Sequence, residues 1–174
     1  MSVENVMTLE KKKGFTLIEL MIVLAIIAIL AVVLIPKSQI FKNNSKNAGV
    51  TTNVNTVRGY LESQVTNNGG IDSYLSDGDL KSKMASNFNL KVSGSSLTPN
   101  SATNTNEQIV NPFDKSKASV VIIGKSGSID NKINMNSNEY KSHPGSVVIY
   151  VYSQGYAVFG VDNDGTATQI LKVK

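Results

Sequence analysis

A long apolar run near the start of the chain is its clearest pattern. Residues 15–35 read FTLIELMIVLAIIAILAVVLI, and Glu19 is their only charged residue. As a helix, this run is about 31 Å long, which is enough to span a bilayer. Its apolar residues lie on all sides, so it is not a surface amphipathic helix. We therefore predict a membrane-spanning helix over residues 15–36.

A second helical pattern follows Pro36. Apolar residues recur four, three, four and four positions apart, which places them on one helical face: Val50, Val54, Val57, Leu61 and Val65. The NNGG sequence at residues 67–70 is a strong stop signal. The pattern predicts that the helix continues over residues 37–68 and packs its apolar face on a sheet. Pro36 removes one helical hydrogen bond and is expected to kink the helix.

Residues 69–117 form a region of weaker patterns. Ser76 or Asp77 is expected to cap a short helix that carries Leu80 and Met84. The segment from Val92 to Gln108 is rich in Ser, Thr and Asn and lacks periodicity, so we expect a surface loop there. Residues 69–117 are therefore interpreted as a variable loop region.

Residues 118–174 are expected to form an antiparallel sheet. Four runs are rich in β-branched and aromatic residues, at 118–124, 146–153, 156–162 and 166–173. Tight-turn sequences at 154–155 and 163–165 join the last three runs into a meander. A long N-terminal helix followed by a small sheet gives an α+β fold class.

Composition narrows the function classes. The net charge of +4 comes from scattered Lys residues and not from a basic stripe, which argues against nucleic-acid binding as the main role. The absence of Cys removes disulfides, thiolate metal sites and thiol catalysis. With no Trp and 6% aromatic residues, a stacking site for sugars or bases is poorly supported.

The flanks of the apolar run leave three interpretations: a cleaved secretory signal, a permanent anchor, or an anchor that is later reused. No pair of small residues two apart follows the run, which disfavours a secretory signal. Lys11, Lys12 and Lys13 favour an anchor, although Lys37 and Lys42 on the other side weaken the orientation signal. Neither a signal nor a plain anchor accounts for Glu19, because an unpaired charge in an apolar setting is costly.

The sequence KKKGFTLIE at residues 11–19 resembles the leader and cleavage region of type IV pilins and pseudopilins. The resemblance implies that residues 1–14 are a leader, removed by a prepilin peptidase between Gly14 and Phe15, and that Phe15 is then N-methylated. It also implies that Glu19 pairs with the terminal amine of a neighbouring subunit and so fixes subunit register. Gly14 suits the cut because a residue without Cβ lets the protease approach the backbone. Loss of the leader leaves a side-chain charge of about +3.

The resemblance further implies the pilin fold and a set of partners. The partners are other copies of the chain in a homopolymer, the peptidase, an assembly ATPase with its platform protein, the membrane, and minor pilins. The protein would be a single-pass membrane protein first and a surface filament afterwards, serving adhesion, motility or aggregation. The NPFD sequence at residues 111–114 and the GYAVFGVDNDGT sequence at residues 155–166 are similar to segments of pilins from Gram-positive bacteria. A pseudopilin of a secretion or DNA-uptake system is the alternative, and a membrane-anchored binding module is a second one.

Other candidate sites are rejected, so we expect no catalytic residue, metal or cofactor. The DNDG sequence at residues 162–165 lacks the remaining ligands of a calcium loop and is interpreted as a turn. His143 is the only His and is expected in an exposed loop. The GKSGS sequence at residues 124–128 lacks the first Gly of a phosphate-binding loop and is also interpreted as a turn.

Overall fold

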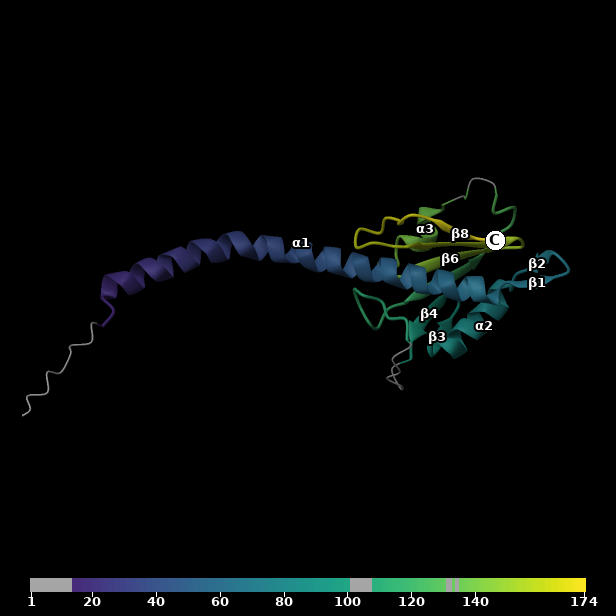
Figure 1. Ribbon diagram of the computed structural model, residues 1–174, viewed down its shortest axis with the longest axis horizontal. Coiled ribbons are helices and arrows are strands. Elements are labelled where there is room, and N and C mark those ends of the chain that lie inside the picture. Colours follow the sequence, from purple (N-terminus) through teal and green to yellow (C-terminus); the bar gives the residue numbers. More distant parts are fainter. Residues whose placement is uncertain (1–13, 101–107, 131–132, 134) are drawn as a thin grey trace, which may run out of the picture. The chain divides into compact units, whose positions relative to one another are not determined.

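The computed structural model describes residues 14–100, 108–130, 133 and 135–174, without the side chains of residues 35–37. The chain divides into an N-terminal unit, residues 1–41, and a sheet unit, residues 42–174. Helix α1, Leu17–Gln64, belongs to both units (Figure 1). Apart from Gly14, the expected leader at residues 1–14 lies outside the described residues.

The N-terminal unit consists of the first part of α1. Its Leu, Ile and Ala residues favour a helix, and no Gly or Pro interrupts them before position 36. The helix continues through position 36, so Pro36 does not end it, and the predicted kink stays a prediction. The apolar N-terminal helix expected from the sequence is confirmed.

The sheet unit contains a six-stranded sheet with the strand order β3-β4-β5-β6-β7-β8. Its strands are β3 (Leu90–Ser93), β4 (Ser96–Pro99), β5 (Val120–Gly124), β6 (Val147–Tyr152), β7 (Gly155–Gly160) and β8 (Leu171–Val173). All neighbours pair antiparallel except β5 and β6, which are parallel. The α+β fold with a mostly antiparallel sheet is thus confirmed, and the β5–β6 pair departs from a pure meander.

One face of the sheet is covered by the second part of α1 and by helix α2, Asp77–Asn87 (Figure 1). The predicted stripe of α1 is buried there: Val50, Val54, Val57 and Leu61. Ser76 caps α2, because its hydroxyl accepts a hydrogen bond from the Asp79 backbone N–H at 3.2 Å. Leu80 and Met84 of α2 are fully buried, as the sequence predicts.

The other face is covered by the connection between β5 and β6, which includes helix α3, Ser137–Tyr140. Its core contains the ring of Phe159, which packs edge-on against Tyr140 and Tyr150 with ring centroids 5.3 Å apart in each pair. A long crossover of this kind is what a parallel strand pair requires. The β5–β6 connection therefore covers this face and contributes Ile129 and Tyr140 to its core.

Three expectations need correction. The helix ends at Gln64, and the NNGG sequence instead turns a hairpin of β1 (Thr66–Asn68) and β2 (Ile71–Ser73). Gly69 and Gly70 both have positive φ, at 64° and 86°, which suits a two-residue hairpin turn.

The expected surface loop at residues 92–108 begins with the end of β3 and the whole of β4. Its polar residues misled the prediction, because only Leu90 and Leu97 of this hairpin face the core. Of the last expected strand, 166–173, only the residues from Leu171 onward form a strand, β8. Before it, the Thr168 hydroxyl accepts a hydrogen bond from the Gly160 N–H at 2.8 Å, so a side chain takes the place of a ladder partner.

Candidate functional site

The segment before α1 is exposed and has no regular secondary structure. Gly14, Phe15 and Thr16 lie ahead of the first helical residue, Leu17. A Cβ at Gly14 would meet no atom within 4 Å, and the Phe15 side chain is 93% exposed. The Gly14–Phe15 peptide bond is therefore accessible to a protease, and cleavage there leaves α1 intact.

Thr16 and Glu19 form a reciprocal cap at the start of α1. The Thr16 backbone N–H and hydroxyl both donate to Glu19 Oε2, each at 2.8 Å. The Glu19 backbone N–H donates in return to the Thr16 hydroxyl at 3.2 Å. This is a capping box, in which two otherwise unpaired backbone donors are satisfied. Thr16 is thus a partner of Glu19 that our sequence analysis missed, although the Thr-x-x-Glu spacing is its signal.

Cleavage before Phe15 would create a positive amine next to the helix N-terminus. The helix dipole also places partial positive charge there, so the amine is unfavourable unless an anion is near. Glu19 is an acidic residue in the first turn, where a carboxylate is favourable for the helix dipole. Because Thr16 lies after the Gly14–Phe15 bond, the capping box would survive cleavage at that bond.

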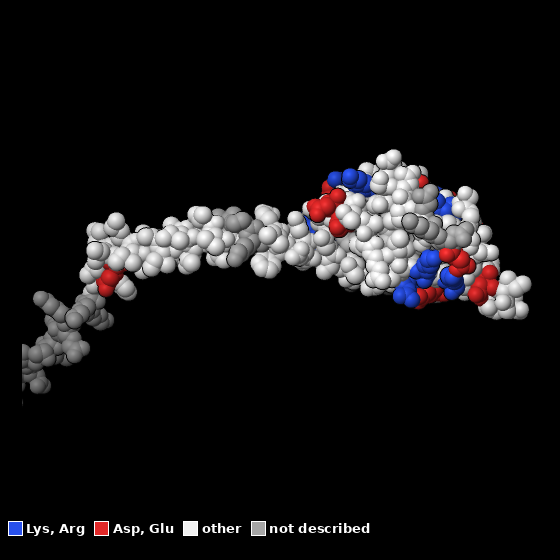
Figure 2. Space-filling model, turned by 90° about the horizontal axis from the view of Figure 1, so that it is seen from above, with Lys and Arg blue, Asp and Glu red and all other residues white. Residues whose placement is uncertain are grey.

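The surface behind this cap is apolar on all sides. Large apolar side chains between Leu17 and Leu34 are each more than half exposed. Figure 2 shows an uncharged surface along this part of the helix, broken near its start by an acidic group. In the described part of the chain, α1 is the one helix that is long and apolar enough to span a membrane. Such a surface requires lipid or another apolar partner.

The other sequence candidates lie in the sheet unit, away from this segment in the sequence. Asp162 Oδ1 accepts hydrogen bonds from the backbone N–H groups of Asp164 (2.9 Å) and Thr166 (2.7 Å), which makes the DNDG sequence a turn. The GKSGS sequence follows β5 and turns at Gly127, with φ of 96°. Among the described residues, no group of three or more His, Cys, Asp or Glu residues could hold a metal ion.

Lys125, from the GKSGS sequence, has a structural role that our sequence analysis did not anticipate. Its ammonium pairs with Glu139 at 2.6 Å and lies 4.4 Å from the centroid of the Tyr150 ring. Burial alone would raise the pKa of Glu139, but hydrogen bonding and the charge of Lys125 lower it below the ordinary value. Burial raises the pKa of the Tyr150 hydroxyl, and the Glu139 carboxylate raises it further.

The comparison with known protein families assigns the N-terminal segment. Residues 10–35 match the family described as the prokaryotic N-terminal methylation motif. This motif is that of the class III signal peptide of type IV pilins. The match contains Gly14, Phe15, Thr16 and Glu19, and thus includes the exposed peptide bond and the capping box.

This motif supports a type IV pilin-like or pseudopilin precursor. It implies processing by a prepilin peptidase and assembly into filaments. It is also consistent with membrane anchoring before assembly. No solved structure matches the chain.

Proposed function

We propose that this chain is the precursor of a type IV pilus subunit. A prepilin peptidase cuts it between Gly14 and Phe15, Phe15 is N-methylated, and the processed chain enters a helical filament. The observation that carries the proposal is an exposed Gly14–Phe15 bond directly ahead of a capped, apolar helix whose first turn holds Glu19.

On this proposal, assembly moves the apolar part of α1 from the membrane into contact with neighbouring subunits. In the membrane the apolar surface of residues 15–36 faces lipid, and in the filament it faces the same segment of neighbouring copies. The amine of one subunit pairs with Glu19 of another, because two buried opposite charges are tolerated in an apolar bundle only together. The pair fixes axial register as a polar contact does in a coiled coil.

Other components follow from this route. Moving the helix out of lipid costs free energy, so a cytoplasmic ATPase and a membrane platform protein drive the step, and minor pilins join the filament. The sheet unit then lies on the filament surface, where it serves adhesion, surface motility or aggregation. A pseudopilin that builds a short filament shares the same motif, and filament length under the electron microscope separates the two.

The test is the N-terminus of the protein purified from its native cells, by intact mass and terminal sequencing. We expect a chain that starts at Phe15 and carries one added methyl group. A chain that starts at Met1 or Ser2 would overturn the proposal and favour a membrane-anchored binding module that keeps its leader.

A further inference from the structure

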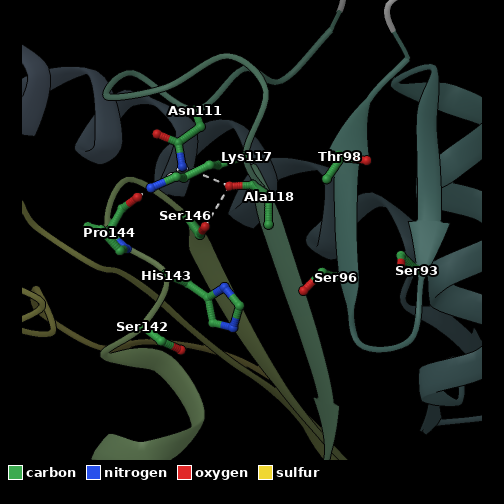
Figure 3. A pocket seen from close by; sticks show the side chains of 10 residues that line it. All are labelled: Ser93, Ser96, Thr98, Asn111, Lys117, Ala118, Ser142, His143, Pro144 and Ser146. Carbon is green, nitrogen blue, oxygen red and sulfur yellow. Dashed lines mark hydrogen bonds between the residues drawn. The ribbon is translucent and has the colours of Figure 1, made fainter.

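The sheet unit contains a small pocket where the β3–β4 hairpin meets the loop before β6 (Figure 3). Its volume is about 280 Å³, which is below the range of pockets that take drug-sized ligands. The lining residues whose side chains carry hydrogen-bond donors include Ser93, Ser96, Lys117, Ser142 and His143. A pocket of this size suits a compact ligand.

The walls of the pocket are held by one buried amide, that of Asn111. Its Nδ2 donates to the Ala118 carbonyl oxygen at 2.8 Å and to the Pro144 carbonyl oxygen at 2.9 Å. Its Oδ1 accepts from the backbone N–H groups of Phe113 (2.9 Å) and Asp114 (3.2 Å). Asn111 therefore joins the segment that carries Lys117 to the loop that carries His143.

Gly145 makes this join possible. Its φ is +86°, and a Cβ at this position would overlap the Asn111 side chain. The loop is fixed further because the His143 N–H donates to the Tyr140 carbonyl oxygen at 2.8 Å, and the Ser146 hydroxyl donates to the Ala118 carbonyl oxygen at 2.6 Å. The backbone of this loop is thus held in place before any ligand arrives, which lowers the entropic cost of binding.

The chemistry of the lining selects the ligand class. Lys117 supplies an ammonium group, His143 an imidazole, and the Ser and Thr residues supply hydroxyl groups. No carboxylate and no Phe, Tyr or Trp ring is among the described lining residues, so the lining favours an anion over a cation and offers a sugar no stacking ring. The Asp114 carboxylate lies outside the lining and accepts hydrogen bonds from the backbone N–H and hydroxyl of Ser116 at 2.9 and 2.7 Å, and these bonds together with the positive charge of Lys117 lower its pKa.

We propose that this pocket binds a phosphate-type oxyanion, with Lys117 supplying the charge and His143, Ser96 and Ser142 donating hydrogen bonds. Figure 3 shows the His143 ring and the Ser96 side chain on opposite walls of the pocket. The anion is either free phosphate or the phosphoryl group of a larger molecule. Hydrogen bonds from charged donors to an oxyanion are the strong class of such bonds.

The experiment uses the only His of the chain as a reporter, since its two imidazole C–H signals are the only ones of that kind in the NMR spectrum. Inorganic phosphate and, separately, glycerol 3-phosphate are titrated into the full chain in detergent micelles at constant pH and ionic strength. We expect a saturable shift of the His143 signals. In Lys117→Gln we expect binding to be about tenfold weaker. Lys83→Gln removes the same charge from α2, outside the pocket lining, and should bind as the parent does.

Each result decides a specific point. Saturation by both ligands assigns the site to the phosphoryl group, and saturation by inorganic phosphate alone assigns it to the free ion. A shift that does not saturate, that chloride reproduces, or that Lys117→Gln leaves unchanged overturns the proposal. A saturable shift with glucose but not with phosphate also overturns it. The spectrum of Ser96→Ala, which keeps every charge, shows whether the hydroxyl groups contribute.

Discussion

Thr16 and Glu19 satisfy each other at the start of α1, with two hydrogen bonds of 2.8 Å to one carboxylate oxygen and one of 3.2 Å in return. The carboxylate that our sequence analysis treated as unpaired in the single subunit therefore has a partner before assembly. In a filament, the amine of a neighbour would approach a carboxylate that is already oriented by its own helix. Because one partner is oriented in advance, less conformational entropy is lost when the ion pair forms.

Glu19→Ala should separate processing from assembly. We expect the variant to enter the membrane and to be cut at the Gly14–Phe15 bond, but to give few or no filaments, because the neighbour's amine is left without a partner. Terminal sequencing of the membrane fraction and the filament yield after shearing measure the two steps. Normal filament yield from Glu19→Ala would contradict the assigned role.

Thr16→Val is the matched variant, since it removes the two hydroxyl bonds of the cap and keeps the carboxylate and the backbone N–H that donates to it. Loss of a cap of this kind costs about 1 kcal/mol of helix stability, which filament contacts can offset. We expect Thr16→Val to assemble, with faster amide hydrogen exchange at Leu20, whose N–H donates to the Thr16 carbonyl oxygen at 3.3 Å.

Gly160→Ala should destabilise the sheet unit. A Cβ at Gly160 would overlap Val50 and press on Val54, so α1 and β7 would have to separate. Overpacking of this kind costs about 1–3 kcal/mol. Gly59→Ala is the control, because Gly59 lies in α1 with no atom within 4 Å of an added Cβ, and should raise stability by about 1 kcal/mol. Thermal unfolding of both variants in detergent checks the opposite signs.

Asn111→Ala should lower the unfolding free energy by at least about 2 kcal/mol, because it leaves the Pro144 carbonyl and two backbone N–H groups without their partner. Asn44→Ala changes the same residue type at an exposed position of α1 and should stay within about 0.5 kcal/mol of the parent. Denaturant unfolding followed by circular dichroism compares the two. Equal effects would show that Asn111 does not hold the loops together.

The Lys125–Glu139 pair predicts an acid-dependent loss of stability. The folded-state pKa of Glu139 is lowered, so its contribution is present above the unfolded pKa, near 4.3, and is lost as pH falls through the folded value. Glu139→Gln should therefore cost about 2 kcal/mol at pH 7 and progressively less toward pH 3. Glu62→Gln removes half of an exposed pair with Arg58 and should cost about 0.5 kcal/mol or less. A Glu139→Gln effect that does not change with pH would contradict the assignment.

Much of this structure was predicted from local sequence patterns. The spacing of Val50, Val54, Val57 and Leu61 predicted which face of α1 is buried, and Ser76 predicted the start of α2. The β-branched runs predicted β5, β6 and β7. The Gly14–Glu19 segment predicted the processing motif, because a short peptide before a helix needs few distant contacts to be recognised.

Features that depend on distant contacts were not predicted. The direction of β5 against β6 is set by the crossover between them and not by either strand's sequence. The β3–β4 hairpin puts only Leu90 and Leu97 into the core, which leaves almost no alternation to detect. Asn111 looked like a loop residue, since its buried role needs the Pro144 carbonyl 33 residues away and the open backbone of Gly145.

The parallel β5–β6 pair has a consequence for folding kinetics. Its strands join only after the chain between Gly124 and Val147 has closed, and non-local pairing of this kind is slow. Until then, Val120–Gly124 and Val147–Tyr152 are uncharged segments rich in β-branched residues, the type that aggregates when exposed. Refolding of the chain should thus compete with aggregation, and the yield of soluble sheet unit should fall as protein concentration rises.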